Sequence, residues 1–194
     1  SFQDAGYQTW IFGKWHLGGD GEGEEPYRPN QRGFEYAYGL NSGFIDYYKH
    51  THCDIHDWYR NGEEIWEDGY STELIANEAI QKVKQRDKNR PFMLYLPFNA
   101  PHGPRQAPKE LIEKYGHVEN ENRRVYSAMV DAMDQAIGRV LMTLDEEGLR
   151  NDTLVVFFSD NGGATRGGAN NGSLGGGKGS VFEGGTRVPA VMRW

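Results

Sequence analysis

The stretch YQTWIFGKWH, residues 7–16, predicts a short buried strand that presents two basic side chains at its carboxyl end. Residues 7–12 are β-prone, and Gly13 closes the run. Lys14 and His16 stand two positions apart, so on an extended strand end they point to the same side and place a cation beside a titratable imidazole. The same pair also fits a solvated lysine and a packed histidine without a functional role. Which interpretation holds depends on whether other polar residues lie at the same edge of the sheet.

Two further apolar runs, at residues 92–96 and 153–158, are typical of strands buried on both faces. Two segments with helical periodicity, at about 72–86 and about 122–147, separate the three apolar runs. Gly148 follows the second segment, at the position of a helix C-cap. The order strand, helix, strand, helix, strand predicts an α/β protein with a three-layer, mostly parallel sheet flanked by helices. In such sheets, ligands bind beyond the carboxyl ends of the strands.

Polar residues also follow the second and third strands. His102 lies in a proline-rich turn after the second strand, and Asp160 and Asn161 directly follow the third. A carboxylate beside an amide oxygen suits Ca²⁺ or Mg²⁺, although Asp-Asn-Gly-Gly is equally a turn sequence. Ca²⁺ takes roughly 6–8 oxygen ligands, so this pair would need further ligands from elsewhere. If the three strands are neighbours, their polar ends form one site for an anionic, oxygen-rich substrate held on a metal.

Two longer segments carry the remaining candidates. Residues 18–70 lack sustained periodicity and suit a functional insertion, in which His50 is a candidate substrate contact. The glycine-dense residues 162–185 contain Lys178. The residues before Lys178 match a phosphate-binding loop, but Gly179 stands where Ser or Thr would hold Mg²⁺, so nucleotide binding is rejected. Lys178 can still bind an anion through its charge and the nearby backbone N–H groups.

Composition narrows the class of partner. The 194 residues contain 21 Lys and Arg against 28 Asp and Glu, a formal net charge of −7 with no basic block, which disfavours binding to nucleic acid or an anionic membrane. No apolar stretch approaches the roughly 18 residues of a membrane span, and the length suits one domain. The single cysteine, Cys53, excludes an internal disulfide. The first residue is not Met and the last residues are apolar, so we interpret both ends as cuts.

Taken together, these residues resemble the sulfatase family, and the resemblance spans the whole chain. Residues 6–18 look like the second signature of that family, and further matching segments follow in the family's order, at Pro101–His102, Ser159–Gly163 and Lys178–Pro189. Residues 46–50 are similar to the arylsulfatase branch, closest to those members that act on sulfated sugars.

The resemblance implies an alkaline-phosphatase-like α/β fold and the hydrolysis of sulfate esters. It also implies a formylglycine, made from Cys or Ser by a maturation enzyme, and Ca²⁺ in preference to Mg²⁺. By this resemblance, Asp160 and Asn161 would be metal ligands. The substrate would be a sulfated small molecule or glycan, and the setting periplasmic, secreted or lysosomal.

The same resemblance assigns roles to the basic residues. Lys14 and His16 would contact the formylglycine hydrate, with His16 helping to deprotonate it as sulfate is expelled. His102 would bind sulfate and protonate the leaving alcohol, and Lys178 would neutralise sulfate charge. Each role suits the chemistry of the side chain, because positioned donors stabilise charge that develops in the transition state.

One part of the family pattern is absent from the sequence. The first signature, Cys or Ser followed by x-Pro-Ser-x-Arg, does not occur, nor does the upstream acidic pair, and Cys53 lacks the proline and arginine that should follow it. We therefore expect residues 1–194 to be one partial catalytic domain, without its N-terminal nucleophile segment and C-terminal subdomain, and inactive alone. Two alternatives stay open: a phosphodiesterase or phosphonate hydrolase of the same superfamily, and a noncatalytic sugar- or calcium-binding module on a degenerate sulfatase fold.

Overall fold

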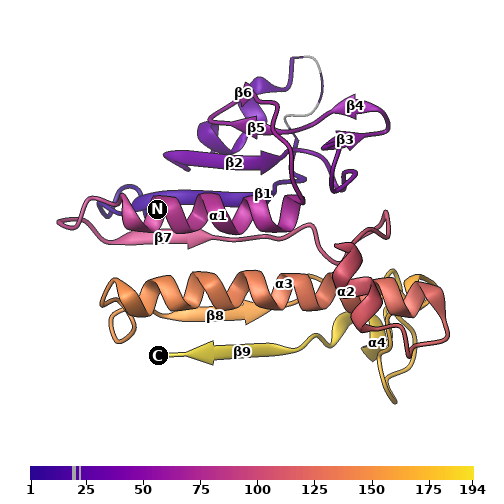
Figure 1. The fold of residues 1–194 in the computed structure, drawn as a ribbon. Coiled ribbons are helices and arrows are strands. Elements are labelled where there is room, and N and C mark those ends of the chain that lie inside the picture. The colour runs from indigo at the N-terminus through magenta and orange to yellow at the C-terminus, as the bar shows by residue number, and fades with distance from the viewer. Residues whose placement is uncertain (19–20, 22) are drawn as a thin grey trace.

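A computed structural model describes residues 1–18, 21 and 23–194 of the chain (Figure 1). The main sheet has five strands in the order β6-β5-β2-β1-β7. Its parallel strands are β2 (Tyr36–Leu40), β1 (Gln8–Lys14) and β7 (Phe92–Tyr95), and its antiparallel edge is β5 (Tyr59–Arg60) with β6 (Glu63–Glu64). Two smaller antiparallel sheets pair β3 (Thr51–His52) with β4 (Ile55–His56), and β8 (Val155–Phe158) with β9 (Ala190–Arg193).

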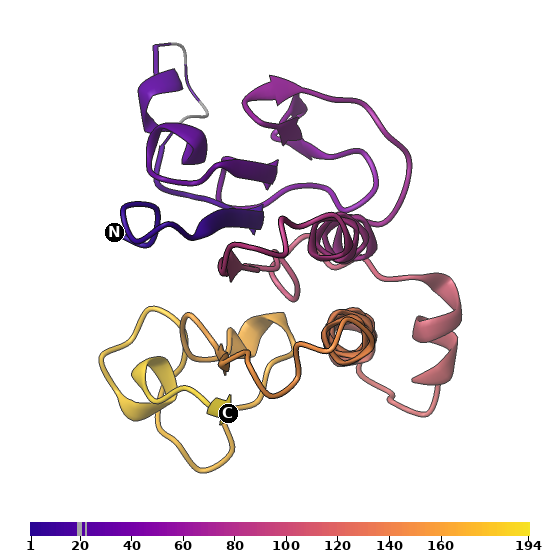
Figure 2. The ribbon, with the colours of Figure 1, turned by 90° about the vertical axis from the view of Figure 1, so that its left-hand side faces the viewer.

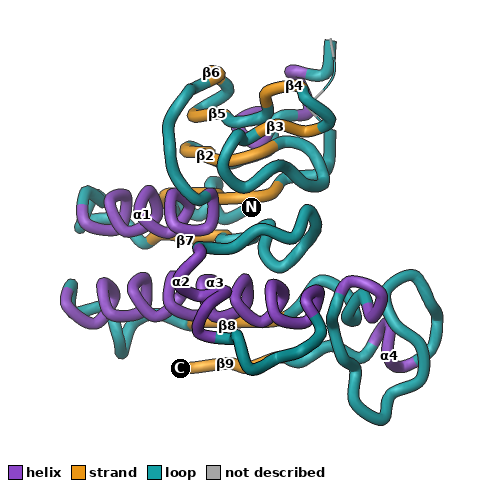
Figure 3. The backbone as a smooth tube through the Cα atoms, turned by 45° about the vertical axis from the view of Figure 1, so that its right-hand side comes forward, coloured by secondary structure: helices purple, strands orange, loops and turns teal. Residues whose placement is uncertain are grey.

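Two long helices pack against each other on one side of the strands, as the end-on view of Figure 2 shows. They are α1 (Ser71–Lys84) and α3 (Glu121–Glu146). The shorter helical elements are η1 (Glu25–Tyr27), η2 (Pro29–Gln31), α2 (Lys109–Lys114), η3 (Thr165–Gly167) and α4 (Glu183–Thr186). Figure 3 shows long loops gathered around α4, at the end of the molecule toward which β7 and β8 point. Among the helices that the structure describes, none has the length and apolarity needed to cross a membrane.

The α/β class and the sheet flanked by helices are confirmed. The three predicted strands correspond to β1, β7 and β8, and the two predicted helices to α1 and α3, with ends within about two residues of the expected positions. Gly148 adopts φ 73°, the left-handed conformation that a helix C-terminal glycine provides without strain. Hydrophobic periodicity was therefore sufficient to locate these five elements.

Strand β2 was missed, because its sequence lies inside the aperiodic segment that we interpreted as an insertion. It pairs with β1 in parallel, with Gly13 opposite Gly39. A Cβ atom added at Gly39 would lie 2.3 Å from the carbonyl oxygen of Gly13, and one added at Gly13 would lie 2.1 Å from that of Pro97. Two glycines thus allow three backbones to approach closely at the carboxyl edge of the sheet.

The prediction that the third strand is buried on both faces is wrong for this structure. β8 runs in the same direction as β7 but is set apart from it (Figure 1), and it pairs with β9 in a separate two-stranded sheet. The Val156, Phe157 and Phe158 side chains are 49%, 42% and 59% exposed. A continuous apolar run indicates that both faces of a strand are suited to burial, but the strand is buried only where other elements pack on both faces. Among the residues that the structure describes, that packing is incomplete.

Apolar packing between the main sheet and α1 fixes the core. Trp10 and Phe12 of β1 are buried with Ile75, Ala79 and Val83 of α1. Residues 10 and 12 share a face because side chains alternate along a strand. Burying an aliphatic or aromatic side chain of this size contributes roughly 1.5–3 kcal/mol, so this face supplies much of the stability that holds the carboxyl edge in place.

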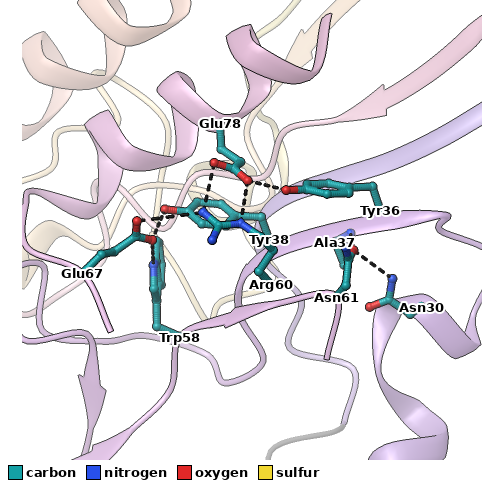
Figure 4. Close-up of polar contacts among 9 residues, drawn as sticks. All are labelled: Asn30, Tyr36, Ala37, Tyr38, Trp58, Arg60, Asn61, Glu67 and Glu78. Carbon is teal, nitrogen blue, oxygen red and sulfur yellow. Dashed lines mark hydrogen bonds and ion pairs between the residues drawn. The ribbon is translucent and has the colours of Figure 1, made fainter. Parts of the chain in front are cut away.

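Two glutamates connect α1 and the loop before it to strands β2 and β5 through hydrogen bonds (Figure 4). Glu78 of α1 accepts hydrogen bonds from the Tyr36 hydroxyl and from Arg60, whose Nε lies 2.8 Å away. Burial and the hydrogen bond to Glu78 raise the pKa of Tyr36 to about 12, so the phenol stays protonated and keeps donating. The second glutamate, Glu67, accepts hydrogen bonds from the Tyr38 hydroxyl and the Trp58 indole.

Replacing Glu78 should loosen this edge measurably. Glu78→Ala leaves a tyrosine hydroxyl and a guanidinium without their acceptor, so we expect the free energy of unfolding to fall by about 2–3 kcal/mol, against about 1 kcal/mol for Glu78→Gln. Urea unfolding followed by circular dichroism measures both. Gln81→Ala, at an exposed position of the same helix, is the control and should change stability by less than about 0.5 kcal/mol. Equal effects of all three substitutions would contradict the assigned role of Glu78.

Candidate active site

The end of β1 is held between the ends of its two neighbouring strands. The backbone N–H of Lys14 donates to the carbonyl oxygen of Pro97 (2.8 Å), and the next two N–H groups donate to those of Leu40 and Asn41 (both 2.9 Å). These bonds extend the parallel ladder past its last paired residues. Lys14 and His16 therefore lie at the carboxyl edge of the sheet, as the sequence predicted. His16, with φ 55°, is not extended, so the expectation that the two side chains point to the same side of an extended strand end does not apply.

A short turn after β2 supports the His16 ring. A Cβ atom at Gly43 would lie 2.8 Å from atoms of that ring, so glycine is required for this contact. The turn itself is held by Asp57, whose two carboxylate oxygens accept hydrogen bonds from the backbone N–H groups of Asn41 and Ser42, each at 2.9 Å. Asp57 is 4% exposed, and a buried carboxylate is retained where such bonds satisfy it. No sequence motif marks Asp57, which is why it was not predicted.

His102 has one ring nitrogen in use and one available. Its Nδ1 lies 2.9 Å from the carbonyl oxygen of Gly103. A carbonyl can only accept, so we assign the hydrogen to Nδ1, which leaves Nε2 free to exchange a proton. Phe44 stacks on the imidazole at 5.5 Å between centroids, and the Tyr47 hydroxyl lies 2.9 Å from the His102 carbonyl oxygen. These contacts orient the His102 side chain on the proline-bracketed turn where the sequence placed it.

The charges of the separate clusters act on one another. Burial lowers the pKa of Lys14, Asp160 opposes that shift and Lys178 adds to it. Burial is also the largest cause that lowers the pKa of His102, and the charges of Lys178, Lys14 and Arg105 lower it further, against the hydrogen bond to the Gly103 carbonyl. Three distant parts of the sequence therefore share one electrostatic environment, with positive charge gathered around a neutral imidazole.

Asp160 and Asn161 lie directly after β8 and retain free oxygen atoms. The Asn161 amide nitrogen donates to the carbonyl oxygen of Gly162 (3.0 Å), which leaves its Oδ1 available. Asp160 is exposed and has no hydrogen bond or ion pair with the residues that the structure describes. These donors suit a hard cation such as Ca²⁺. Among the described residues, however, no group of three or more His, Cys, Asp or Glu could hold a metal, so the pair offers part of a site.

Asn171 ties the Asp160 loop to the Lys178 loop. Its Oδ1 accepts a hydrogen bond from the backbone N–H of Gly163 (2.9 Å), and its Nδ2 donates to the carbonyl oxygens of Gly163 and Gly176 (both 3.1 Å). The backbone N–H of Lys178 donates to the same Gly163 carbonyl at 3.2 Å. One amide side chain thus fixes a glycine-dense segment, a role that no sequence signal announced.

His50 does not join this group. It is 1% exposed, its ring stacks on Trp58 at 4.6 Å between centroids, and its Nε2 lies 3.2 Å from the carbonyl oxygen of Gly69. Burial lowers the pKa of His50, so it is a neutral packed ring. The expectation of a substrate contact is corrected, because a side chain enclosed in this way has no surface to offer a ligand.

The arrangement defines an α/β protein in which basic side chains and oxygen donors gather at the carboxyl edge of the strands. Two lysines supply positive charge, His102 offers a proton-exchanging nitrogen, and the Asp160–Asn161 pair offers hard oxygen ligands. A Sulfatase family model matches residues 1–194. The chain belongs to the sulfatase family.

Individual relatives agree with this assignment. Arylsulfatase J of Mus musculus is 37% identical over 194 residues, covering 96% of this chain, and N-acetylgalactosamine-6-sulfatase of Homo sapiens is 31% identical over 206 residues, covering 98%. The solved structure of Ps i-CgsB in complex with k-i-k-neocarrahexaose superimposes with a TM-score of 0.91 at 35% identity, over 99% of this chain.

The chain matches only a part of each relative. It spans 32% of arylsulfatase J, 38% of N-acetylgalactosamine-6-sulfatase and 46% of the solved Ps i-CgsB chain. Family and fold are therefore established over these residues, whereas the activity of the whole protein is a matter for proposal.

Removing the Lys178 charge should raise the pKa of His102. The ammonium group disfavours a second positive charge nearby, so in Lys178→Met the imidazolium becomes easier to form and the pKa moves up toward the ordinary histidine value. Titration of the His102 ring by NMR measures this shift. Lys84→Met, in the last turn of α1, is the matched control and should leave the titration unchanged. An unaltered His102 titration in Lys178→Met would show that the two side chains do not share a site.

Proposed function

We propose that the full-length protein hydrolyses sulfate esters of sugars. The observation that carries the proposal is the convergence of Lys14, His102 and Lys178 around one edge of a sulfatase fold, where the two lysine charges can bind a sulfate group beside the His102 imidazole. Two relatives support sugars as the substrate class, because one is named for N-acetylgalactosamine 6-sulfate chemistry and another was solved with a carrageenan hexasaccharide.

Ca²⁺ and a formylglycine are part of this proposal. Asp160 and Asn161 would hold the metal together with ligands from outside these 194 residues, because Ca²⁺ requires roughly 6–8 oxygens. The bound cation and the formylglycine would supply charge neutralisation and the nucleophile. Lys14 would hold the hydrated aldehyde by its charge, and His16, braced against Gly43, would accept a proton from it when sulfate leaves.

His102 and Lys178 would act on the substrate itself. Lys178 would neutralise the sulfate, and His102 would bind the ester and give a proton to the leaving sugar oxygen through Nε2. The Nδ1 contact with Gly103 suits this role, because it fixes the ring and leaves Nε2 available for proton transfer. A bound sulfate would also offset the neighbouring positive charges that lower the pKa of His102, so the substrate would favour the protonated form that the step needs.

A comparison of two variants tests the proposal. The full-length protein, produced together with a formylglycine-generating enzyme, should hydrolyse an aryl sulfate and a sulfated carrageenan hexasaccharide in the presence of Ca²⁺. His102→Ala should lower kcat by about 10²-fold or more, because a positioned acid contributes about 10²–10⁴-fold. His117→Ala removes an imidazole from the loop between α2 and α3 and should have little effect.

The other functions give different outcomes. Hydrolysis of phosphate esters in preference to sulfate esters would indicate a phosphodiesterase or phosphonate hydrolase. Binding of the hexasaccharide without turnover, when mass spectrometry confirms the formylglycine, would indicate a noncatalytic sugar-binding module. Either result would contradict the proposed sulfatase.

We also propose that these residues form part of one larger catalytic domain. The chain spans less than half of each relative reported above, and β8 and β9 expose apolar side chains at Phe158, Val191 and Met192. The isolated 194-residue chain should therefore show no Ca²⁺-dependent turnover of an aryl sulfate under conditions in which the full-length protein is active. Sulfate release by the purified chain would refute this. A periplasmic, secreted or lysosomal setting remains the family expectation.

A further inference from the structure

A second polar site lies beside the candidate active site, between the start of α3 and the η3 loop. It is a pocket of about 310 Å³, within the range of sites that hold small ligands. Its lining is almost entirely polar: Asn120, Asn122, Arg123, Thr165, Arg166, Gly168, Ala169 and Asn170. The roles proposed above for the sulfatase reaction use none of these residues.

The charged and hydrogen-bonding groups of the lining indicate which kind of ligand this pocket would bind. Two arginines line it and no Asp or Glu does, in a chain whose formal net charge is −7. Glu119 and Glu121 flank Asn120 in sequence but are not among the lining residues. Guanidinium groups bind sulfate and carboxylate through paired N–H donors, and asparagine amides donate to and accept from hydroxyls. The combination suits a sugar that carries a negative charge.

Arg166 has its charge available. Its side chain is exposed and forms no hydrogen bond or ion pair within the part of the chain that the structure describes. Arg123 is partly engaged: its Nη1 donates to the carbonyl oxygen of Gly168 at 2.8 Å, and its guanidinium lies 5.6 Å from the centre of the Tyr126 ring. Arg123 therefore positions the pocket wall, while Arg166 is the cation that a ligand can reach.

Close backbone contacts make the pocket rigid. A Cβ atom at Gly168, where φ is 95°, would lie 2.7 Å from the carbonyl oxygen of Asn122, so the loop and the first turn of α3 can approach only with glycine there. Asn171 then anchors the end of the loop to Gly163. Rigid walls reduce the ordering cost of binding.

Arg105 connects this pocket to the candidate active site. Its Nη1 donates to the carbonyl oxygen of Pro101 (2.7 Å), next to His102, and its charge is one of those that lower the pKa of His102. On its other side a Cβ atom at Gly167 would lie 1.6 Å from Arg105 Nη2, so this guanidinium packs directly on the η3 loop. One side chain thus separates His102 from the loop that forms the pocket.

We propose that this pocket is a subsite for a second, negatively charged sugar unit of an oligosaccharide whose sulfate ester is bound at His102 and Lys178. The inference rests on the proposed function and specifies its substrate as an oligosaccharide with charges on more than one unit. Arg166 binds the charged group. The asparagine amides bind hydroxyls chiefly through their N–H groups, because the Oδ1 atoms of Asn120 and Asn170 already accept backbone hydrogen bonds.

Substrates of different length test the subsite. The probes are an aryl sulfate, which is too small to fill the pocket, and a sulfated carrageenan hexasaccharide, both given to the full-length protein with Ca²⁺. In Arg166→Gln the ratio of kcat/KM for the hexasaccharide to that for the aryl sulfate should fall about tenfold, through KM, as expected for loss of a charge-assisted hydrogen bond. Lys84→Gln removes a positive charge from the far end of α1 and should leave the ratio unchanged.

Two outcomes would overturn the subsite. One is an unchanged ratio in the Arg123→Gln, Arg166→Gln double variant, and the other is an equal loss on both substrates. Calorimetric binding of the hexasaccharide separates this inference from the proposed reaction. Binding that weakens about tenfold in Arg166→Gln without any turnover would support the subsite and reject the sulfatase activity. Turnover of both substrates, with hexasaccharide affinity independent of Arg166, would reject the subsite alone.

Discussion

The close approach of three backbones at Gly13 is the constraint on which the rest of the structure depends. Gly13 lies opposite Gly39 of β2 and against the carbonyl of Pro97 after β7, and a Cβ atom at either glycine would overlap a neighbouring backbone. The residues that follow these glycines are therefore fixed relative to each other by main-chain hydrogen bonds. Lys14 and His16 take their positions from this contact, and the turn that supports His16 begins at the same level of the sheet.

Positively charged side chains that repel one another must be held together by other contacts. Lys14, Lys178 and Arg105 all act unfavourably on a charged His102, and the chain as a whole is acidic. Backbone hydrogen bonds restrain two of these cations, because the N–H of Lys14 donates to the Pro97 carbonyl and that of Lys178 to the Gly163 carbonyl. Arg105 is restrained through its side chain, which donates to the Pro101 carbonyl. Under the proposed function, this restraint would place the positive charges before a sulfate group binds, which favours charge stabilisation without reorganisation.

Residues that have no part in the proposed reaction hold the candidate site residues in position. Asp57 accepts two backbone N–H groups of the turn beneath His16, Phe44 stacks on His102, and Asn171 joins the Asp160 and Lys178 loops. Arg105 links the His102 turn to η3. These contacts explain how loops rich in glycine and proline can present functional side chains in fixed places. They also join the candidate active site to the polar pocket at the start of α3.

The sequence alone determined the five periodic elements, the sulfatase family and the residues at the strand ends, because hydrophobic period, glycine position and side-chain chemistry are local properties. Only the tertiary structure decided that β2 belongs to the main sheet, that β8 is partly exposed and that His50 is packed against Trp58. It also placed Arg166 in the lining of a polar pocket, and it revealed the positioning contacts of Asp57 and Asn171. Their roles depend on contacts between segments distant in sequence, and burial and hydrogen-bond partners are properties of the folded arrangement that no single segment encodes.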